Sequence, residues 1–267
     1  MLLLLELFLA LCFGFFLSTL TSFFNVVIFR TFREESFTKG RSKCEHCHQQ
    51  INWYDNIPLF SFLILRGRCR FCHKKIKFIY FLTELTAFIL GFVFVLTLIE
   101  VPWLGSFSPW LLVLYFLIFF VLLFALLADL QYLIVPDFFI VLLSILVLVA
   151  QVLSKQSWLL SLLAVLFSST FFVGLYFLAK KILKKEALGL GDVKLMIPIA
   201  FLLSWPKIVL NIFLAFIIGG FFAMLMLLIK RKKLGQALPF APFLILSALI
   251  SFFFGEAIWH WYWGLLF

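Results

Sequence analysis

The chain has 267 residues, of which 65% are hydrophobic and 13% charged, and its mean hydropathy is +1.18. A soluble domain is about half apolar and about a quarter charged, so this composition excludes an ordinary soluble enzyme and a disordered protein. It predicts an all-α polytopic membrane protein, because several apolar runs are long enough to cross a bilayer. The net charge of +10 then reports on membrane topology more than on nucleic-acid binding.

Apolar runs in chain order predict about eight transmembrane helices. The first run lacks the basic n-region and small-residue cleavage site of a signal peptide, so we expect a retained helix. The run before Trp205 is short and contains Pro198, which makes it the weakest of the predicted helices. The runs cover residues 2–29, 78–99, 110–128, 138–153, 158–179, 193–204, 208–229 and 241–263.

Lys and Arg are concentrated on one side of the predicted bundle. Segments 30–77, 180–194 and 230–233 contain 11, 5 and 4 of the 22 basic residues, and all three fall on the same side if eight helices alternate. The other side has only Lys155 and Lys207. The positive-inside rule therefore predicts that the basic side is cytoplasmic and that both termini lie outside. Because the charge is divided among separate loops beside the lipid bilayer, we expect no nucleic-acid partner.

Four of the five cysteines form two CxxC pairs in segment 30–77. Each pair can place two thiolates on one metal through a tight turn, and two pairs complete the closed tetrahedral shell of a structural zinc site. A reducing cytoplasmic compartment favours zinc over disulfides. We therefore predict one structural Zn2+ ion bound at Cys44, Cys47, Cys69 and Cys72.

Other interpretations of this loop stay open. His46, His48 and His73 lie beside the pairs and are alternative ligands, and the thiols are alternatively redox-active or without metal. Zinc would supply the folding free energy that so small a segment lacks, of order 10–16 kcal/mol in zinc-finger peptides. Apolar and aromatic residues at 51–65 are expected to pack on the membrane face. Cys12, in the first run, is expected to be a small buried hydrophobe.

Only twelve residues are acidic, so an acid at the end of a membrane helix is informative. Asp129 ends the third run and Asp192 follows a glycine turn at the start of the sixth, which places both at the same membrane depth. Two close carboxylates do not both ionise readily and share one proton. The ionised one can accept a proton from water while the protonated one polarises a peptide carbonyl. The pair predicts aspartic-protease chemistry.

Each of these acids also has a structural interpretation. Asp192 alternatively N-caps the sixth helix, and Asp137 is expected to N-cap the fourth because it follows a proline. Asp129 is alternatively a snorkelling residue or the proton relay of a transporter. Glu84 lies inside the second helix and is either structural or substrate-facing.

Together these motifs resemble the bacterial type IV prepilin peptidase (leader peptidase/N-methyltransferase) family, a GxGD-type family similar to presenilin-like intramembrane aspartyl proteases. The resemblance covers nearly the whole chain, and Ala241 stands where the family pattern has a glycine. It includes both CxxC pairs, SFFNVVIFR at 22–30, NIPL at 56–59, LRGRC at 65–69, the D-x7-D segment with IVP at 129–137, GLGDVKL at 189–195 and LPFAPF at 238–243.

This resemblance implies that Asp129 and Asp192 are the catalytic aspartates, with Asp137 the less suited acid. It implies cleavage of the short basic leader of prepilin or pseudopilin substrates, after a glycine, at the cytoplasmic face of the inner membrane. It further implies methylation of the new N-terminal residue, often Phe, with S-adenosylmethionine. No Gly-rich nucleotide-binding signature accompanies this second activity, so its cofactor-binding residues are unknown.

We therefore expect a first transmembrane helix at 1–29, a four-cysteine zinc-binding loop at 30–77 and a membrane peptidase core of about seven helices at 78–267. Two other functions remain as alternatives. One is a proton-coupled transporter that uses the intramembrane Asp residues, and the other is a zinc-dependent membrane assembly factor without catalysis. A further hypothesis pairs Glu34 and Glu35 with the basic leader of the substrate.

Overall fold

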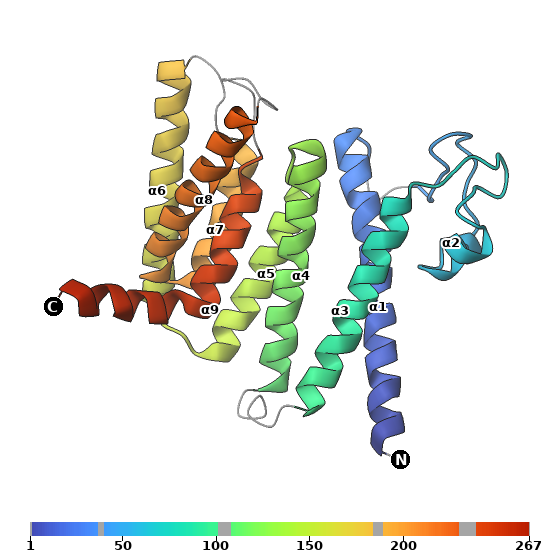
Figure 1. Ribbon diagram of the computed structural model, residues 1–267, viewed down its shortest axis with the longest axis horizontal. Helices are drawn as coiled ribbons and strands as arrows, with labels where there is room; N and C mark the ends of the chain where they lie inside the picture. Colours follow the sequence, from blue (N-terminus) through green and yellow to red (C-terminus); the bar gives the residue numbers. More distant parts are fainter. Residues whose placement is uncertain (1, 37–39, 101–107, 184–188, 230–238, 267) are drawn as a thin grey trace. The chain divides into compact units, whose positions relative to one another are not determined.

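The structure is a computed structural model that describes residues 2–36, 40–100, 108–183, 189–229 and 239–266 (Figure 1). These residues form helices, turns and two isolated β-bridges, which confirms the all-α class. They divide into two compact units, Met1–Pro109 and Trp110–Phe267, here called the N-terminal and C-terminal units. Some residues used in the sequence predictions lie outside the described residues: Lys39, Lys184, Lys185, the basic run 230–233 and Leu238.

The N-terminal unit is built on two antiparallel helices, α1 (Leu2–Phe32) and α3 (Phe78–Glu100). Glycines let them approach closely, because a Cβ at Gly14 would lie 2.9 Å from Phe88 and one at Gly91 would lie 2.7 Å from Leu17. A long loop joins the two helices and contains a 3-10 turn, η1 (Trp53–Asn56), and a short helix, α2 (Phe60–Ile64). All four CxxC cysteines belong to this loop.

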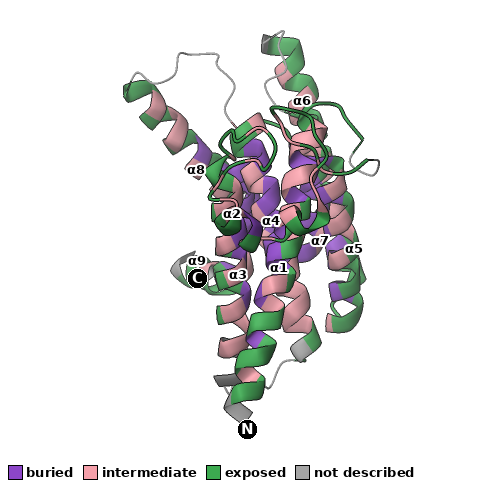
Figure 2. Cartoon of the chain, turned by 90° about the vertical axis from the view of Figure 1, so that its right-hand side faces the viewer, coloured by how far each residue is buried: buried purple, intermediate pink, exposed green. Residues whose placement is uncertain are grey.

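The C-terminal unit is a bundle in which α7 is the most enclosed helix. Leu195, Met196 and Ile199 of α7 are fully or almost fully buried, and Figure 2 shows buried residues along it. Aromatic residues such as Phe124 and Phe172 fill the remaining interior. The helices are α4 (Pro109–Tyr132), α5 (Asp137–Ser154), α6 (Trp158–Leu183), α7 (Leu190–Leu203), α8 (Lys207–Leu228) and α9 (Ala241–Leu266).

Seven helices of the described chain are long and apolar enough to cross a membrane: α1, α3, α4, α5, α6, α8 and α9. The protein is therefore a multi-pass membrane protein. The remaining predicted helix corresponds to α7, which has 14 residues. Such a helix rises about 21 Å, less than the ~30 Å of the hydrocarbon layer, so α7 spans only part of the bilayer.

Two local details differ from the sequence predictions. Helix α4 continues to Tyr132, so Asp129 lies within its last turn and not at its end. The prediction that Cys12 is buried was wrong, because this side chain is exposed. Helix α1 packs against α3 along one face, and side chains such as Leu4 and Phe8 on its other faces are exposed (Figure 2).

Candidate functional site

The structure brings Asp129 and Asp192 together at one end of the C-terminal unit. Asp129 lies in the last turn of α4 and Asp192 in the first turn of α7, and their residues are only 5% and 7% exposed. The charge of Asp129 acts directly on Asp192. The backbone N–H of Ala241, the first residue of α9, interacts with both carboxylates. Three helix ends therefore converge on the pair.

The glycine turn before α7 aims the Asp192 carboxylate. Gly189 is the N-cap of α7 and accepts a 3.1 Å hydrogen bond from the Asp192 N–H, while the Gly189 N–H interacts with the Asp192 side chain. The second contact is the half of a capping box in which the side chain at the third helical position reaches back to the N-cap N–H. A Cβ at Gly189 would lie 3.3 Å from Asp192 Oδ2. The N-cap interpretation of Asp192 is therefore wrong, because Gly189 holds that position and Asp192 faces the other acid.

Asp129 retains an atom with unused hydrogen-bonding capacity. Its Oδ2 is buried and has no hydrogen-bond partner among the described residues. A buried carboxylate oxygen is costly unless something binds it. The arrangement is therefore suited to holding a water molecule or a substrate group against Asp129.

Asp137 stands apart from the buried pair. The prediction that it N-caps α5 was wrong, since Pro136 is the N-cap and no side-chain cap hydrogen bond forms. Asp137 is already the first helical residue, so its carboxylate points to solvent and accepts hydrogen bonds from Lys194 Nζ at 2.8 and 3.0 Å. Both side chains are exposed, at 71% and 52%.

The LPFAPF segment fixes the backbone group that faces both acids. Phe240 packs against Phe172 and Phe216, with ring centroids 6.3 and 5.3 Å apart. A Cβ at Gly219 of α8 would lie 3.2 Å from Phe243, so the start of α9 is held tightly against α8. Sequence reasoning missed Ala241 as a site residue because it acts through its N–H, which any residue except proline provides. The only available signal was the motif around it.

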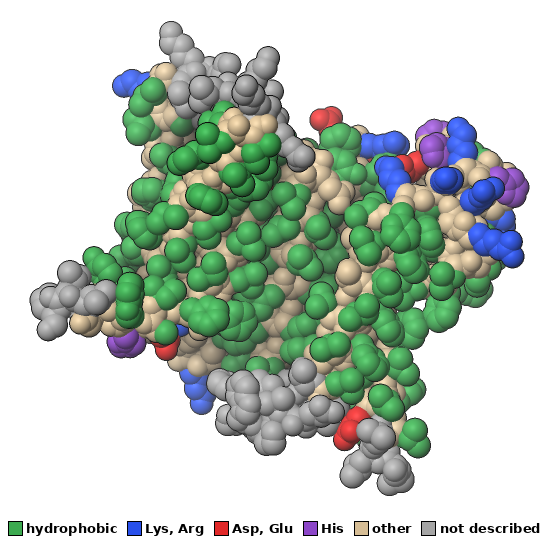
Figure 3. Space-filling model, in the orientation of Figure 1, with side chains coloured by type: hydrophobic (Ala, Val, Ile, Leu, Met, Phe, Trp, Pro, Cys, Tyr) green, Lys and Arg blue, Asp and Glu red, His purple; other side chains and the backbone are tan. Residues whose placement is uncertain are grey.

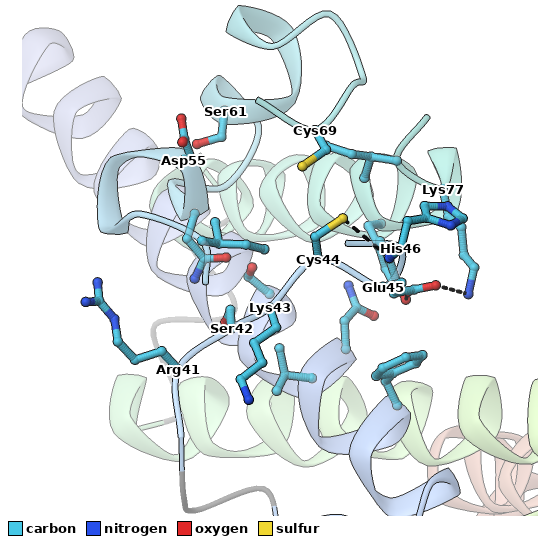
Figure 4. A pocket seen from close by; sticks show the side chains of 18 of the residues that line it. Arg41, Ser42, Lys43, Cys44, Glu45, His46, Asp55, Ser61, Cys69 and Lys77 are labelled. Carbon is cyan, nitrogen blue, oxygen red and sulfur yellow. Dashed lines mark hydrogen bonds and ion pairs between the residues drawn. The ribbon is translucent and has the colours of Figure 1, made fainter. Parts of the chain in front are cut away.

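The four CxxC cysteines also come together, in the loop of the N-terminal unit. All four Sγ atoms lie within 4.8 Å of one another, and those of Cys44 and Cys72 are 3.8 Å apart. Zn–S bonds of 2.3 Å give a tetrahedron with edges of about 3.8 Å, whereas a disulfide needs about 2.05 Å. All are free thiols, and Figure 4 shows the sulfurs of Cys44 and Cys69 directed toward the same space. The donor set fits a metal ion of the zinc class.

Two turns with the same hydrogen-bond pattern carry these thiols. In each turn, the histidine after the second cysteine donates its N–H to the carbonyl of the first cysteine, at 3.0 Å. Both histidines, His48 and His73, adopt a left-handed φ of 56° that the tight turn requires. Each turn is closed by an antiparallel bridge, Lys43 with Gln50 and Arg68 with Lys75. Among the described residues the metal-binding group consists of the four cysteines and includes no histidine.

The thiols influence one another strongly. Burial disfavours the Cys44 thiolate, but backbone N–H groups of Cys47 and His46 and the neighbouring thiols outweigh it and lower the pKa of Cys44 to about 7. The Gln49 N–H favours a thiolate at Cys47, but desolvation and hydrogen bonds with the other thiols raise the pKa of Cys47 to about 11. The protein alone therefore stabilises one negative charge here and resists a second. A divalent cation removes this conflict.

A cavity of about 710 Å³ lies between the cysteine turns and the adjoining ends of α1 and α3. Ion-paired side chains line it, and Figure 4 shows the pair of Glu45 and Lys77. Glu45 pairs with Lys77 at 2.8 Å and accepts a 2.6 Å hydrogen bond from the Tyr80 hydroxyl. Burial opposes ionisation of Glu45, but these two partners dominate and lower its pKa. Asp55 forms a bidentate pair with Arg70 at 2.6 and 2.8 Å.

Glu84 and Glu35 also line this cavity. Glu84 is 9% exposed, and its Oε2 accepts a 3.0 Å hydrogen bond from the Leu59 N–H. Glu84 is thus both structural, because it ties the loop to α3, and cavity-facing. Glu34 adopts a left-handed φ of 58° at the end of α1.

Family comparisons divide the chain into the same two parts. Residues 9–98 match the bacterial peptidase A24 N-terminal domain, and residues 115–224 match the type IV leader peptidase family. The prepilin leader peptidase/N-methyltransferase of Aeromonas hydrophila is 30% identical over 83% of this chain and 74% of its own length. The chain belongs to the type IV prepilin leader peptidase family.

Other relatives with the same name agree with this membership. The Legionella pneumophila protein is 30% identical over 84% of this chain and 76% of its own length. The Vibrio cholerae serotype O1 protein is 41% identical over 38% of this chain and 41% of its own length. No solved structure matches. The Asp pair and the four-cysteine cluster thus lie in different family segments, the first in the leader-peptidase segment and the second in the A24 N-terminal segment.

Proposed function

We propose that this protein is an aspartic endopeptidase that removes the leader of prepilin or pseudopilin substrates, and that Asp129 and Asp192 perform the chemistry. The observation that carries the proposal is the convergence of two buried carboxylates on one backbone N–H, with one carboxylate oxygen that has no partner among the described residues. The names of its relatives supply the substrate class. The transporter alternative has no comparable support.

The mechanism uses the two carboxylates in complementary protonation states. The ionised carboxylate removes a proton from a water molecule, whose oxygen attacks the carbonyl carbon of the scissile peptide. The protonated carboxyl donates a hydrogen bond to the carbonyl oxygen as negative charge develops there. Collapse of the tetrahedral intermediate breaks the C–N bond, and the leaving amine takes a proton from the pair. The Ala241 N–H holds the carboxylates in place.

Replacement of Asp129 or Asp192 by Asn tests this assignment. Each variant should lose cleavage of a purified prepilin in detergent by about 10²–10⁴-fold or more, since general acid–base groups contribute that much. Asp137→Asn is the matched control, because Asp137 is a nearby acid outside the buried pair, and it should retain cleavage. Membrane insertion and an unchanged thermal unfolding midpoint report that the variants are folded. Normal processing by Asp129→Asn or Asp192→Asn contradicts the assignment.

The distribution of Lys and Arg supports an orientation of the chain in the membrane. Segments 30–77, 180–194 and 230–233 together contain 20 of the 22 Lys and Arg residues, and the positive-inside rule supports a cytoplasmic location for them. We propose that the protein lies in the inner membrane with its peptidase site at the cytoplasmic face. Protease digestion of inverted and right-side-out vesicles should cleave the cysteine loop in the inverted vesicles only.

Two bound groups belong to the proposal. Zinc would be held by Cys44, Cys47, Cys69 and Cys72 and would supply a closed structural shell. S-adenosylmethionine would supply the methyl group for the N-terminal amine released by cleavage. The cavity beside the cysteines is within the usual 300–1,000 Å³ range of ligand sites, and the carboxylates on its wall suit a sulfonium cation. Equilibrium dialysis with radiolabelled S-adenosylmethionine should show weaker binding by Glu35→Gln than by Glu34→Gln.

A further inference from the structure

The segment between the two cysteine turns presents an apolar surface outward. Phe60, Leu63 and Ile64 of α2 are 49%, 61% and 71% exposed, and Ile57 before them is 40% exposed. Contiguous apolar side chains of this size on a small water-facing subdomain usually mark an interaction surface. The segment 57–65 contains one polar side chain, Ser61, and that residue is buried.

Contacts with α1 reveal the depth of this segment. The Phe60 ring stacks on Phe15 at a centroid distance of 5.5 Å. Helix α1 has 31 residues, Leu2–Phe32, and about 20 residues cross the hydrocarbon layer. Every stretch of that length within α1 includes Phe15, so Phe15 lies inside the hydrocarbon wherever the boundary falls. Phe60 reaches the same depth.

A second contact ties α2 to the other membrane helix. The Phe62 ring stacks on Phe81 of α3 at 4.8 Å. The inner face of α2 is therefore occupied by protein on both sides, while Leu63 and Ile64 point away from it. Exposed apolar side chains also cover the outer faces of α1 and α3, and Figure 3 shows hydrophobic side chains below the basic cluster of this unit.

Six backbone N–H groups of this segment are paired without water. The Leu59 N–H donates to Glu84 Oε2 at 3.0 Å, and the Ile57 N–H donates to Ser61 Oγ at 2.9 Å. Ser61 in turn donates its hydroxyl to the Tyr54 carbonyl. The N–H groups of Phe60, Ser61, Leu63 and Leu65 donate to carbonyls within the segment. Non-helical backbone is tolerated at membrane depth only when its polar groups are paired in this way.

Residues at both ends of the segment match a membrane boundary. Trp53 and Tyr54 are 73% and 45% exposed on the side where the chain enters, and such aromatic residues favour the headgroup level. Arg66 and Arg68 follow the segment and are exposed, and Figure 3 shows Lys, Arg and His gathered over this part of the unit. Basic side chains complement the anionic headgroups of the cytoplasmic leaflet.

We propose that residues 57–65 form a re-entrant segment inserted into the bilayer, with lipid acyl chains covering Phe60, Leu63 and Ile64. This insertion anchors the four-cysteine loop at the membrane surface independently of the Asp pair. Glu84 then satisfies the Leu59 N–H inside the membrane. The apolar side chains of residues 57–65 that line the cavity then lie at the lipid boundary.

Nitroxide accessibility measures this directly on the full-length protein in liposomes of phosphatidylethanolamine and phosphatidylglycerol. In a Cys12→Ser background, spin labels at Leu63→Cys or Ile64→Cys should collide often with oxygen and rarely with a water-soluble nickel chelate. The native Cys12 is the lipid-facing reference, and Gln50→Cys, an exposed polar position in the same loop, is the water-facing reference. The background with only the zinc cysteines corrects for labelling of the metal site.

The outcomes separate lipid from the other possible occupants. An oxygen-to-nickel collision ratio at positions 63 and 64 close to that of Cys12 supports insertion. A ratio close to that of Gln50→Cys overturns it, because the surface is then in water. Low accessibility to both reagents also overturns it and indicates a protein contact.

Discussion

The four-cysteine cluster of the N-terminal unit and the carboxylate pair of the C-terminal unit both gather side chains from distant parts of the chain. They differ in whether each of their polar atoms has a ligand or hydrogen-bond partner available. The thiols match the four corners of a zinc shell, which has no open position. The carboxylates leave Asp129 Oδ2 without a partner among the described residues.

This difference is the one expected between a structural site and a reactive one. A closed thiolate shell stabilises the loop around it and does not exchange ligands with a substrate. A buried carboxylate pair with an unfilled position costs folding free energy and holds an atom ready to bind water. We therefore expect the chemistry at the carboxylate pair, where a buried polar atom lacks a hydrogen-bond partner among the described residues.

The largest effect should come from removing the metal ligands. Replacement of all four CxxC cysteines by Ser should reduce bound zinc from one ion per chain to none, and should make residues 40–77 sensitive to protease, because metal binding supplies about 10 kcal/mol or more of folding free energy. Metal analysis and limited proteolysis measure both. Cys12→Ser should keep its zinc. Zinc that remains bound in the four-Ser variant would show that the cysteine cluster is not the metal site.

A smaller effect is expected from the backbone donor between the two acids. Ala241→Pro deletes the N–H that faces both carboxylates, and proline is tolerated at the first helical position. A hydrogen bond to a charged group contributes about 1.5–3 kcal/mol, so kcat/KM for leader cleavage should fall roughly 10–150-fold. Ala241→Gly keeps the N–H and should cleave normally. Equal activity of the two variants would show that the N–H has no role.

The glycine turn gives a more graded test. A Cβ at Gly189 would contact the Asp192 carboxylate at 3.3 Å, whereas one at Gly191 would make an ordinary 3.5 Å contact with Val135. Displacing a reacting group by a few tenths of an ångström should reduce cleavage roughly tenfold in Gly189→Ala. Gly191→Ala should stay within about threefold of the wild type, by the same argument. The opposite ranking would mean that Gly189 does not set the position of Asp192.

The smallest effect concerns a pH-dependent ion pair in the cysteine loop. The Arg70 guanidinium lowers the pKa of Asp55, so this pair stabilises the loop above the unfolded pKa of about 3.9 and stops doing so as the pH falls through the still lower folded value. Asp55→Asn should therefore lower the loop's thermal unfolding midpoint slightly at pH 7, and this difference should vanish near pH 3. Arg70→Gln should show the same pattern. A difference that grows in acid would contradict the assigned sign.

Sequence patterns predicted the features that depend on neighbouring residues. Seven of the apolar runs are helices long enough to span, because length and hydropathy decide that locally. The charge bias and the GxGD turn placed Asp129 and Asp192 at a common depth, and the structure brings the two together. The CxxC spacing anticipated the sulfur cluster, although His48 and His73 proved to be turn residues and not members of it.

Other features were wrong or absent in the sequence predictions because they arise from contacts between distant segments. Asp137 follows a proline and looked like a cap, but Pro136 holds the N-cap position and the Asp137 carboxylate pairs with Lys194, far along the chain. Cys12 looked buried in an apolar run, but only one face of α1 meets α3. Ala241 contributes its backbone N–H to the site, which the identity of its side chain does not reveal.

By itself, the amino-acid sequence determined the membrane class, the concentration of basic residues in three loops, and which acids and thiols were available for chemistry. Composition and periodicity are enough to identify these features, because each depends only on the type and spacing of residues within a short stretch of the chain. Only the tertiary structure decided which polar groups are satisfied and which are not. Within the described part of the chain, Asp129 keeps an oxygen without a hydrogen-bond partner, the Leu59 N–H binds Glu84, and Phe60 stacks on Phe15. Such pairings depend on how helices pack and are not visible in local sequence.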